Sequence, residues 1–269
     1  MNGNNMRICK TLRQKLMPAV LTLLLAGIIL AACVVKGETM PTFSGRVWLD
    51  SNTYLVGGNG QPIVLVNNPN ASNPTLLQLL DFVRSDQTDK IPYSSAFVCA
   101  DFAETLYNSA ESQGIKAAYI VLRGVRHTIN AFQTTDAGLI FIDCTGESSQ
   151  VIPQINTAYA NTLGEASGCD KVAYIESGKP LGVISLDAAA SHYGFSYSGY
   201  EQWEKDKELF DTELDSYNRQ VNGRLFVPQL EYDQLQEEFH SIDLLKNQLG
   251  AFLEEAGVVQ SYQIFWEGK

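Results

Sequence analysis

Residues 99–144 read CADFAETLYNSAESQGIKAAYIVLRGVRHTINAFQTTDAGLIFIDC and carry the clearest pattern of secondary structure in the sequence. Behind Cys99, apolar side chains recur at spacings of three and four from Phe102 to Ala110. This period is typical of one apolar helix face, so the stretch predicts a helix that begins at about Cys99. Gly114 follows where a left-handed cap is expected to end that helix.

Three strands are predicted after the helix. The continuous apolar run Ile115–Leu122 indicates a buried strand, and two more follow at Arg126–Phe132 and Leu139–Cys144 around a polar turn. The order helix, strand, strand, strand favours an α+β domain in which the helix packs on an antiparallel sheet.

The last two strands bring together two chemically active side chains. If their turn centres on Thr135, Ile129 faces Phe141 and His127 faces Asp143, all on one face of the sheet. Directly opposed residues have Cβ atoms about 4.5–5.5 Å apart, close enough for a carboxylate to accept a hydrogen bond from an imidazole. A register slip of one residue would remove this pairing.

Cys99 completes a possible catalytic triad. At a helix N-terminus the thiol meets unsatisfied backbone N–H groups, and an imidazole beside it lowers its pKa further, which favours a thiolate nucleophile. Asp143 would then orient His127 and stabilise its charged form. The Cys99 backbone N–H and Tyr93, from the preceding loop, are the candidate donors to an oxyanion.

The segments Phe97–Ala103, Gly114–Ala117 and Leu139–Thr145, with His127 between them, resemble the core of the transglutaminase-like superfamily. In that family the nucleophilic cysteine opens a helix, a Gly-Ile pair and a strand follow, and the histidine and aspartate lie on the next two strands. The resemblance covers about residues 75–145. It implies a papain-like core and acyl transfer or hydrolysis of peptide or amide bonds through Cys99, His127 and Asp143, with no cofactor.

One residue departs from the family's pattern, and two other functions stay open. Members often have an aromatic residue two positions after the histidine, where this chain has Ile129. The fold could instead serve a catalytically inactive surface module for binding or scaffolding. It could also belong to another Cys/His hydrolase, such as a papain-like peptidase, with a different third residue.

The N-terminus is typical of an exported protein. Basic residues between positions 7 and 15 precede the apolar run Leu16–Ala32, and the sequence Leu-Ala-Ala-Cys ends at Cys33. This resembles the lipobox of bacterial lipoproteins, which implies cleavage before Cys33 and lipidation of its thiol and amine. The alternative is a transmembrane anchor with an incidental cysteine. Both place the rest of the chain on the outer face of the membrane.

Three cysteines follow Cys33, which is an odd number in a compartment that permits disulfides. Cys99, Cys144 and Cys169 leave one thiol over whichever pair forms a disulfide, and a Cys144–Cys169 bridge would leave Cys99 free. Cys144 follows Asp143 on a strand and therefore points to the opposite face, into the core or towards a disulfide partner.

Composition excludes some classes of function. The 30 acidic and 19 basic side chains give a net charge of −11, the wrong sign for nucleic-acid binding. His192 and His240 have no partners at metal-site spacing, so no metal is expected. The expected partners are a membrane, through the lipid anchor, and a protein, peptide or envelope polymer as substrate or ligand.

The C-terminal part changes to a heptad pattern. Apolar residues repeat in one seam from Trp203 to Val221 and in a second from Leu235 to Leu253, separated by breakers that include Gly223 and Pro228. The pattern predicts an antiparallel helical hairpin. Its seams could pack on the main domain, or the hairpin could project or mediate oligomerisation.

The predicted organisation has four parts. A signal peptide spans residues 1–32, a lipidated tether 33–45, the transglutaminase-like domain 46–199 and the C-terminal helical region 200–269. Within the main domain, smaller elements are expected as a hairpin over 46–67, a helix from Pro74 to about Ser85, and strands at 172–175 and 181–184.

Overall fold

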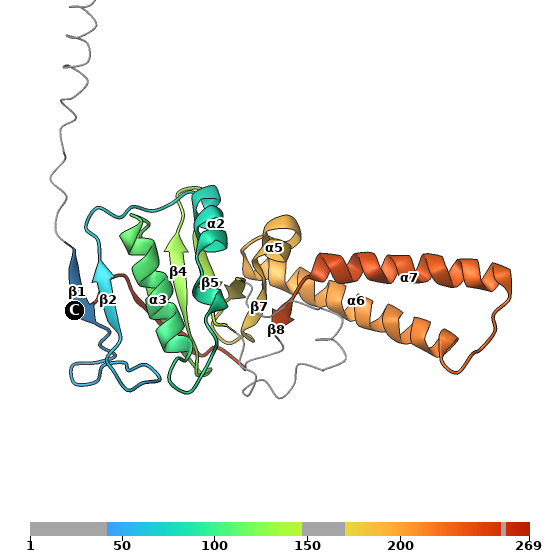
Figure 1. The fold of residues 1–269 in the computed structure, drawn as a ribbon, viewed down its shortest axis with the longest axis horizontal. Coiled ribbons are helices and arrows are strands. Elements are labelled where there is room, and N and C mark those ends of the chain that lie inside the picture. The colour runs from blue at the N-terminus through green and yellow to red at the C-terminus, as the bar shows by residue number, and fades with distance from the viewer. Residues whose placement is uncertain (1–41, 147–169, 254–256) are drawn as a thin grey trace, which may run out of the picture. The chain divides into compact units, whose positions relative to one another are not determined.

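The computed structural model describes residues 42–146, 170–253 and 257–269. The predicted signal peptide, the tether up to residue 41, and Cys169 lie outside this part of the chain. Residues 41–269 cluster as one compact unit. The unit is a mixed α+β fold with antiparallel sheets, as the sequence predicted (Figure 1).

A seven-stranded antiparallel sheet forms the centre of the unit. Its strand order is β8-β7-β6-β5-β4-β3-β9, so strands from the last part of the chain form both edges. A separate two-stranded ribbon pairs β1 with β2. The strands are β1 (Phe43–Arg46), β2 (Val64–Asn67), β3 (Ala118–Arg123), β4 (Thr128–Gln133), β5 (Leu139–Asp143), β6 (Lys171–Tyr174), β7 (Gly182–Ser185), β8 (Phe252–Leu253) and β9 (Ser261–Phe265).

The helices fall into two groups. Those that precede the sheet are α2 (Leu76–Ser85), the short 3₁₀ helix η1 (Thr88–Lys90) and α3 (Cys99–Ser112). Those that follow β7 are α5 (Leu186–Ala188), the π-helical turn η2 (Ala189–Tyr193), α6 (Tyr197–Val221) and α7 (Gln229–Leu249). The predicted helix at Cys99 is therefore confirmed, and Gly114 beyond its end has the expected left-handed conformation, with φ +78°.

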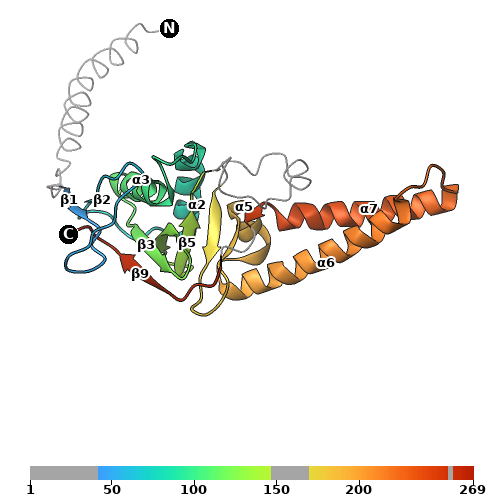
Figure 2. The same ribbon diagram turned by 90° about the horizontal axis from the view of Figure 1, so that it is seen from below.

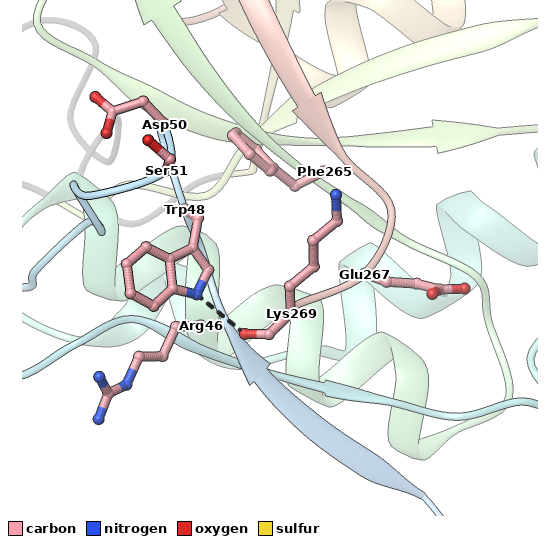
Figure 3. A pocket seen from close by; sticks show the side chains of 7 residues that line it. All are labelled: Arg46, Trp48, Asp50, Ser51, Phe265, Glu267 and Lys269. Carbon is pink, nitrogen blue, oxygen red and sulfur yellow. Dashed lines mark hydrogen bonds between the residues drawn. The ribbon is translucent and has the colours of Figure 1, made fainter.

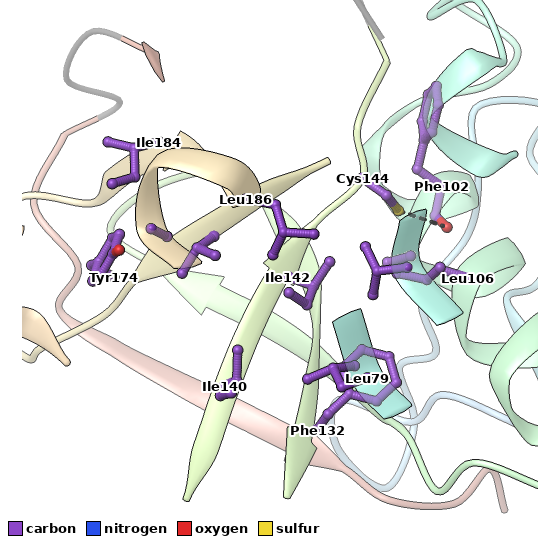
Figure 4. Packing of buried hydrophobic residues seen from close by; sticks show 14 of the residues in the cluster. Leu79, Phe102, Leu106, Phe132, Ile140, Ile142, Cys144, Tyr174, Ile184 and Leu186 are labelled. Carbon is purple, nitrogen blue, oxygen red and sulfur yellow. Dashed lines mark hydrogen bonds between the residues drawn. The ribbon is translucent and has the colours of Figure 1, made fainter. Parts of the chain in front are cut away.

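The main hydrophobic core lies between the sheet and helices α2 and α3. In this cluster Leu79 of α2 and Leu106 of α3 meet Phe132, Ile140 and Ile142 of the sheet (Figure 4). These five side chains are fully buried. Burying a side chain of this size stabilises the fold by about 1.5–3 kcal/mol, so the core fixes α3 firmly against β4 and β5.

The polar face of α3 holds the β1–β2 ribbon through a row of acceptors. Glu104 Oε1 accepts from Val64 N at 2.7 Å, and Asn108 Oδ1 accepts from Val66 N at 2.7 Å. One turn further, Glu111 Oε2 accepts from Asn68 N at 2.9 Å. Residues three and four apart share one helix face, so this acceptor row occupies the unpaired edge of β2.

The register of β4 and β5 differs from the prediction. The structure pairs Gln133 with Leu139 and Ala131 with Phe141, so Asp143 falls opposite Ile129 and not opposite His127. The expected turn centre at Thr135 was wrong by one residue: the Thr134 hydroxyl donates to Gly138 O and accepts from Ala137 N, which centres the turn on Asp136. The resulting shift of two residues keeps each side chain on its predicted face.

The smaller predicted elements of the main domain are largely present. Helix α2 ends at Ser85, and β6 and β7 match the two strands expected after residue 170. The lead-in hairpin is less regular than expected. Only its ends form the β1–β2 ladder, and isolated bridges at Trp48–Tyr54 and Val56–Pro62 connect the rest.

The C-terminal residues form a helical hairpin that returns to the sheet. Helices α6 and α7 run side by side away from the sheet (Figures 1 and 2), and their seams pack mainly on each other. At the base, Trp203 Nε1 donates to Leu249 O at 3.0 Å and its ring meets Phe252. The second seam ends at Leu249, since Leu253, predicted as its last member, lies in β8.

The expected helical region 200–269 therefore also contains sheet strands. Strand β8 pairs with β7, and β9 pairs with β3 along five residue pairs. Among the helices of residues 42–146, 170–253 and 257–269, none combines the length and the hydropathy of a membrane span.

The C-terminal segment is tied to α3 by a buried hydroxyl. The Tyr107 hydroxyl lies 2.9 Å from Asn67 Oδ1 and 2.9 Å from the Trp266 carbonyl oxygen. Gly268 N also donates to Asn67 Oδ1, at 3.1 Å. One phenol group thus joins the helix, the ribbon and the end of the chain.

Tyr107→Phe should lower the free energy of unfolding by about 1–3 kcal/mol, because the Trp266 carbonyl oxygen loses its phenol donor and Asn67 Oδ1 keeps only the Gly268 N–H. Urea denaturation measures this change. Tyr262→Phe is the matched control, since Tyr262 is 40% exposed. Equal effects of the two substitutions would contradict the assigned role of Tyr107.

Candidate active site

Cys99 is the first residue of α3, and Asp101 fixes the backbone around it. Asp101 Oδ2 accepts from Val98 N and from Gly58 N, each at 2.8 Å. A Cβ at Gly57 would lie 2.0 Å from Asp101 Oδ1, so this approach requires glycine. The carboxylate at this position pairs with backbone N–H groups at the helix N-terminus, which is a structural role.

His127 and Asp143 form a direct pair. His127 Nε2 lies 2.9 Å from Asp143 Oδ2, and Thr145 N donates to Asp143 Oδ1 at 2.9 Å. The Asp143 side chain is fully buried, while that of His127 is 18% exposed. With Nε2 bound to the carboxylate, Nδ1 is the ring nitrogen left for a proton exchange with another group.

The two side chains meet although they are not directly opposed. His127 lies in the connection before β4, and its carbonyl oxygen accepts from Leu122 N at 3.0 Å. In the observed register it is diagonal to Asp143. Diagonal neighbours are about 7–8 Å apart at Cα, a distance that an imidazole and a carboxylate can span.

Burial and charge act in opposite directions on this pair. Burial alone would lower the pKa of His127, but the Asp143 carboxylate and Cys99 raise it to about 10. Burial alone would raise the pKa of Asp143, but His127, Lys171 and the Thr145 N–H hold it well below its usual range. The favoured state at neutral pH is therefore an imidazolium bound to a carboxylate.

These pKa shifts set the pH range in which the pair stabilises the fold. The raised pKa of His127 gives stability that is complete below its unfolded value of about 6.5 and is lost as the pH rises through about 10. The lowered pKa of Asp143 gives stability that is complete above its unfolded value of about 3.9 and is lost at lower pH. The pair therefore contributes most between about pH 4 and 6.5.

The Cys99 thiol is acidified by its neighbours. Burial alone would raise the pKa of Cys99, but hydrogen bonding to His127, the charge of His127 and the nearby polar groups of Thr128 lower it. A thiol with a lowered pKa beside an imidazolium is the arrangement that produces a thiolate nucleophile near neutral pH. The structure thus brings together all three residues that the sequence singled out.

Tyr93 also lies at the site. Its ring stacks on Phe102 with centroids 6.0 Å apart. Burial and the charge of Cys99 raise the pKa of Tyr93, while a hydrogen bond from the Cys99 backbone N–H opposes this change. The two predicted oxyanion donors, the Tyr93 hydroxyl and the Cys99 N–H, are therefore neighbours.

Sequence reasoning missed two polar residues beside the triad. Thr128 contacts Cys99, and Lys171 lies opposite Asp143 on β6, where its Nζ donates to Thr145 O at 2.8 Å. A threonine in a strand and a lysine in a weakly patterned segment carry no motif. The position of Thr128 directly after His127 was the only available signal.

The other predicted cysteine sites are only partly described. Cys144 is a free, buried thiol in the core, and its Sγ lies 3.7 Å from Phe102 O (Figure 4). Cys169, its predicted disulfide partner, and Cys33, the predicted lipidation site, lie outside the described residues. Burial raises the pKa of Cys144 well above its usual value, so this thiol is poorly suited to act as a nucleophile.

A separate hollow lies at the ribbon and the end of the chain. It has a volume of about 470 Å³ and is lined by Arg46, Trp48, Asp50, Ser51, Phe265, Glu267 and Lys269 (Figure 3). Trp48 Nε1 donates to Lys269 O at 3.2 Å. None of the triad residues lines it. Among the described residues, no group of three His, Cys, Asp or Glu side chains could hold a metal ion.

Comparisons with known proteins give no match: neither a protein family model, nor a curated protein, nor a solved structure is similar to this chain. The function is therefore inferred from the geometry and electrostatics of the site itself.

Asp143→Asn should lower the pKa of His127 by about one to three pH units, because the neutral amide no longer stabilises the imidazolium. ¹H–¹⁵N NMR of the imidazole rings across a pH titration measures the change. Signals of the exposed His192 and His240 serve as references within the same sample. Asp81→Asn, on the exposed side of α2, is the control, and an equal effect of both variants would contradict the pairing.

Proposed function

We propose that the chain is a transglutaminase-like, cysteine-dependent enzyme that cleaves or transfers acyl groups at amide or peptide bonds. The observation that supports this most directly is the His127–Asp143 pair, at 2.9 Å, beside a thiol at the first residue of α3. Nucleophile, base and orienting carboxylate come from a helix N-terminus and two adjacent strand ends. This is the order of elements that the family resemblance implies.

The residues suit a two-step acyl transfer. The Cys99 thiolate would attack the carbonyl carbon of an amide, and the carbonyl oxygen would take the negative charge beside the Cys99 N–H and Tyr93 hydroxyl. As the C–N bond breaks, the His127 imidazolium would give its Nδ1 proton to the leaving amine. This leaves a thioester on Cys99 and a neutral imidazole on His127.

The second step regenerates the thiolate. Neutral His127 would take a proton from water or from a primary amine, which attacks the thioester carbonyl and expels the Cys99 sulfur. Water gives hydrolysis, and an amine gives a new amide. Asp143 would remain ionised throughout and hold the ring in one orientation.

Cys99 should be alkylated by iodoacetamide at pH 6 faster than a free model thiol, because its thiolate persists below the usual thiol pKa of about 8.5. Peptide mapping by mass spectrometry after graded times and pH values measures this reaction. Buried Cys144 should stay unlabelled in the folded protein and is the internal control. Labelling of Cys99 only above about pH 8.5, at the rate of the model thiol, would count against an enzyme and favour a binding module.

Activity can be sought with general probes. A fluorescent primary amine and casein test amide formation, and a glutamine-containing peptide tests release of ammonia. Cys99→Ala should abolish any activity found, by at least about a thousandfold, since the covalent intermediate cannot form. Cys144→Ala is the matched cysteine control and should retain it.

We further propose that the protein is held at the outer face of a membrane through lipid on Cys33. The lipobox-like sequence that ends at Cys33 supports this assignment. Two or three acyl chains bind a membrane far more firmly than one. A substrate or ligand would then be a protein, peptide or polymer of the cell envelope.

Cys33→Ala should abolish incorporation of a labelled fatty acid, because no acyl chain can be attached at residue 33. The mass of the protein gives an independent readout, since the variant should keep residues 1–32 while the unmodified protein loses them by cleavage before Cys33. Cys9→Ala is the matched control and should leave both results unchanged. A Cys33→Ala protein that still incorporates the fatty acid would exclude this site of lipidation.

A further inference from the structure

Two buried polar atoms on strand β4 have no hydrogen-bond partner within the described residues. They are Thr128 Oγ1 and Asn130 Oδ1. Thr128 is 6% exposed and Asn130 is fully buried. Buried polar groups are nearly always paired, so an unpaired one needs an explanation in the chemistry around it.

The packing of β4 on α3 places Thr128 at the nucleophile. Asn130 Nδ2 donates to Ala103 O at 2.9 Å, which fixes the alignment of the strand and the helix. The step from Asn130 back to Thr128 covers about 6.6 Å along the strand, and the step from Ala103 back to Cys99 covers about 6 Å along the helix. Thr128 therefore lies beside Cys99 in the same way that Asn130 lies beside Ala103, and the lowering of the Cys99 pKa by the polar groups of Thr128 agrees with this alignment.

We propose that the Thr128 hydroxyl donates a hydrogen bond to the Cys99 thiolate and is a further catalytic residue of the site. A thiolate is a strong acceptor and a neutral thiol a weak one, so the bond favours the ionised sulfur. Thr128 would bind the sulfur from the first residue of β4, while His127 would bind it from the residue just before the strand. This role depends on the proposed function, since it requires that Cys99 ionises to react.

The bond predicts a specific kinetic signature. Removing the hydroxyl makes the thiolate harder to form, but once formed it is no less reactive, because a thiolate of higher pKa is a better nucleophile. The pH at which Cys99 reacts should therefore change, while the rate at high pH should not fall. A purely structural role for Thr128 would disturb both quantities.

The test measures the pH dependence of Cys99 alkylation by iodoacetamide in the full-length protein, with each cysteine followed by mass spectrometry. Thr128→Val, which replaces the hydroxyl with a methyl group, should raise the midpoint by about one pH unit and slow the reaction at pH 6 by roughly three- to tenfold. The plateau rate at high pH should stay within about twofold of the unmodified protein or exceed it. Thr128→Ser keeps the hydroxyl and should retain the original midpoint.

Thr105→Val is the matched control for loss of a threonine hydroxyl. Thr105 lies on the same helix as Cys99, but its hydroxyl donates to Asp101 O at 2.8 Å. In Thr105→Val the pH midpoint of Cys99 alkylation should equal that of the unmodified protein. Circular dichroism at each pH checks that all variants are folded, and Thr128→Ala, which also removes the hydroxyl, carries the test if Thr128→Val does not fold.

Two results would overturn the inference, and they can be told apart. An unchanged low midpoint in Thr128→Val would exclude a hydrogen bond from the Thr128 hydroxyl to the thiolate. A midpoint raised in Thr128→Ser as much as in Thr128→Val would exclude it too, and both results would leave the proposed enzyme intact. A midpoint of about 8.5 in the unmodified protein would remove both proposals, since no stabilised thiolate would exist.

Discussion

Hydrogen bonds along the polar face of α3 fix the position of the catalytic thiol proposed at its first residue. The helix buries its apolar face on the sheet and uses Asp101, Glu104, Asn108 and Glu111 to bind backbone N–H groups of residues 58–68. It is therefore held from both sides, and its first residue cannot shift along the sheet without breaking several buried contacts. Because Cys99 is that residue, the same interactions that close the fold also fix the distance between the thiol and the ends of β4 and β5.

The electrostatics of the site follow from its burial. Each of Cys99, His127 and Asp143 would favour its neutral form if buried alone, and each is shifted the other way by its neighbours. A buried charge is tolerated when it is paired and hydrogen-bonded, and here the three groups supply one another's partners together with the Thr145 N–H and Lys171. Removing one member would leave the others uncompensated, so the three behave as a unit.

The sequence was informative where period and residue type act locally. The helix at Cys99 and the strands behind it followed from apolar spacing, because side chains of a 3.6-residue helix and a two-residue strand must reach the core at fixed intervals. It was uninformative about long-range pairing. Strand β9 joins β3 at the edge of the sheet, and the acceptor row on α3 reads as an ordinary solvated face until β2 is known to cover it. The offset between β4 and β5 depended on the hydrogen bond from the Thr134 hydroxyl to Gly138 O, and the residue types of the turn do not reveal that bond.

The error in register did not separate the predicted pair, and the reason also explains the role proposed for Thr128. Shifting a strand by two residues preserves which face each side chain occupies, so His127 stayed on the side of Asp143 and reached it diagonally. Consecutive residues within a strand point to opposite faces, and His127 and Thr128 could not both approach one sulfur from inside β4. His127 lies just before the first residue of the strand, where the pleat no longer dictates its direction. The start of β4 at Thr128 thus allows two neighbouring residues to converge on Cys99.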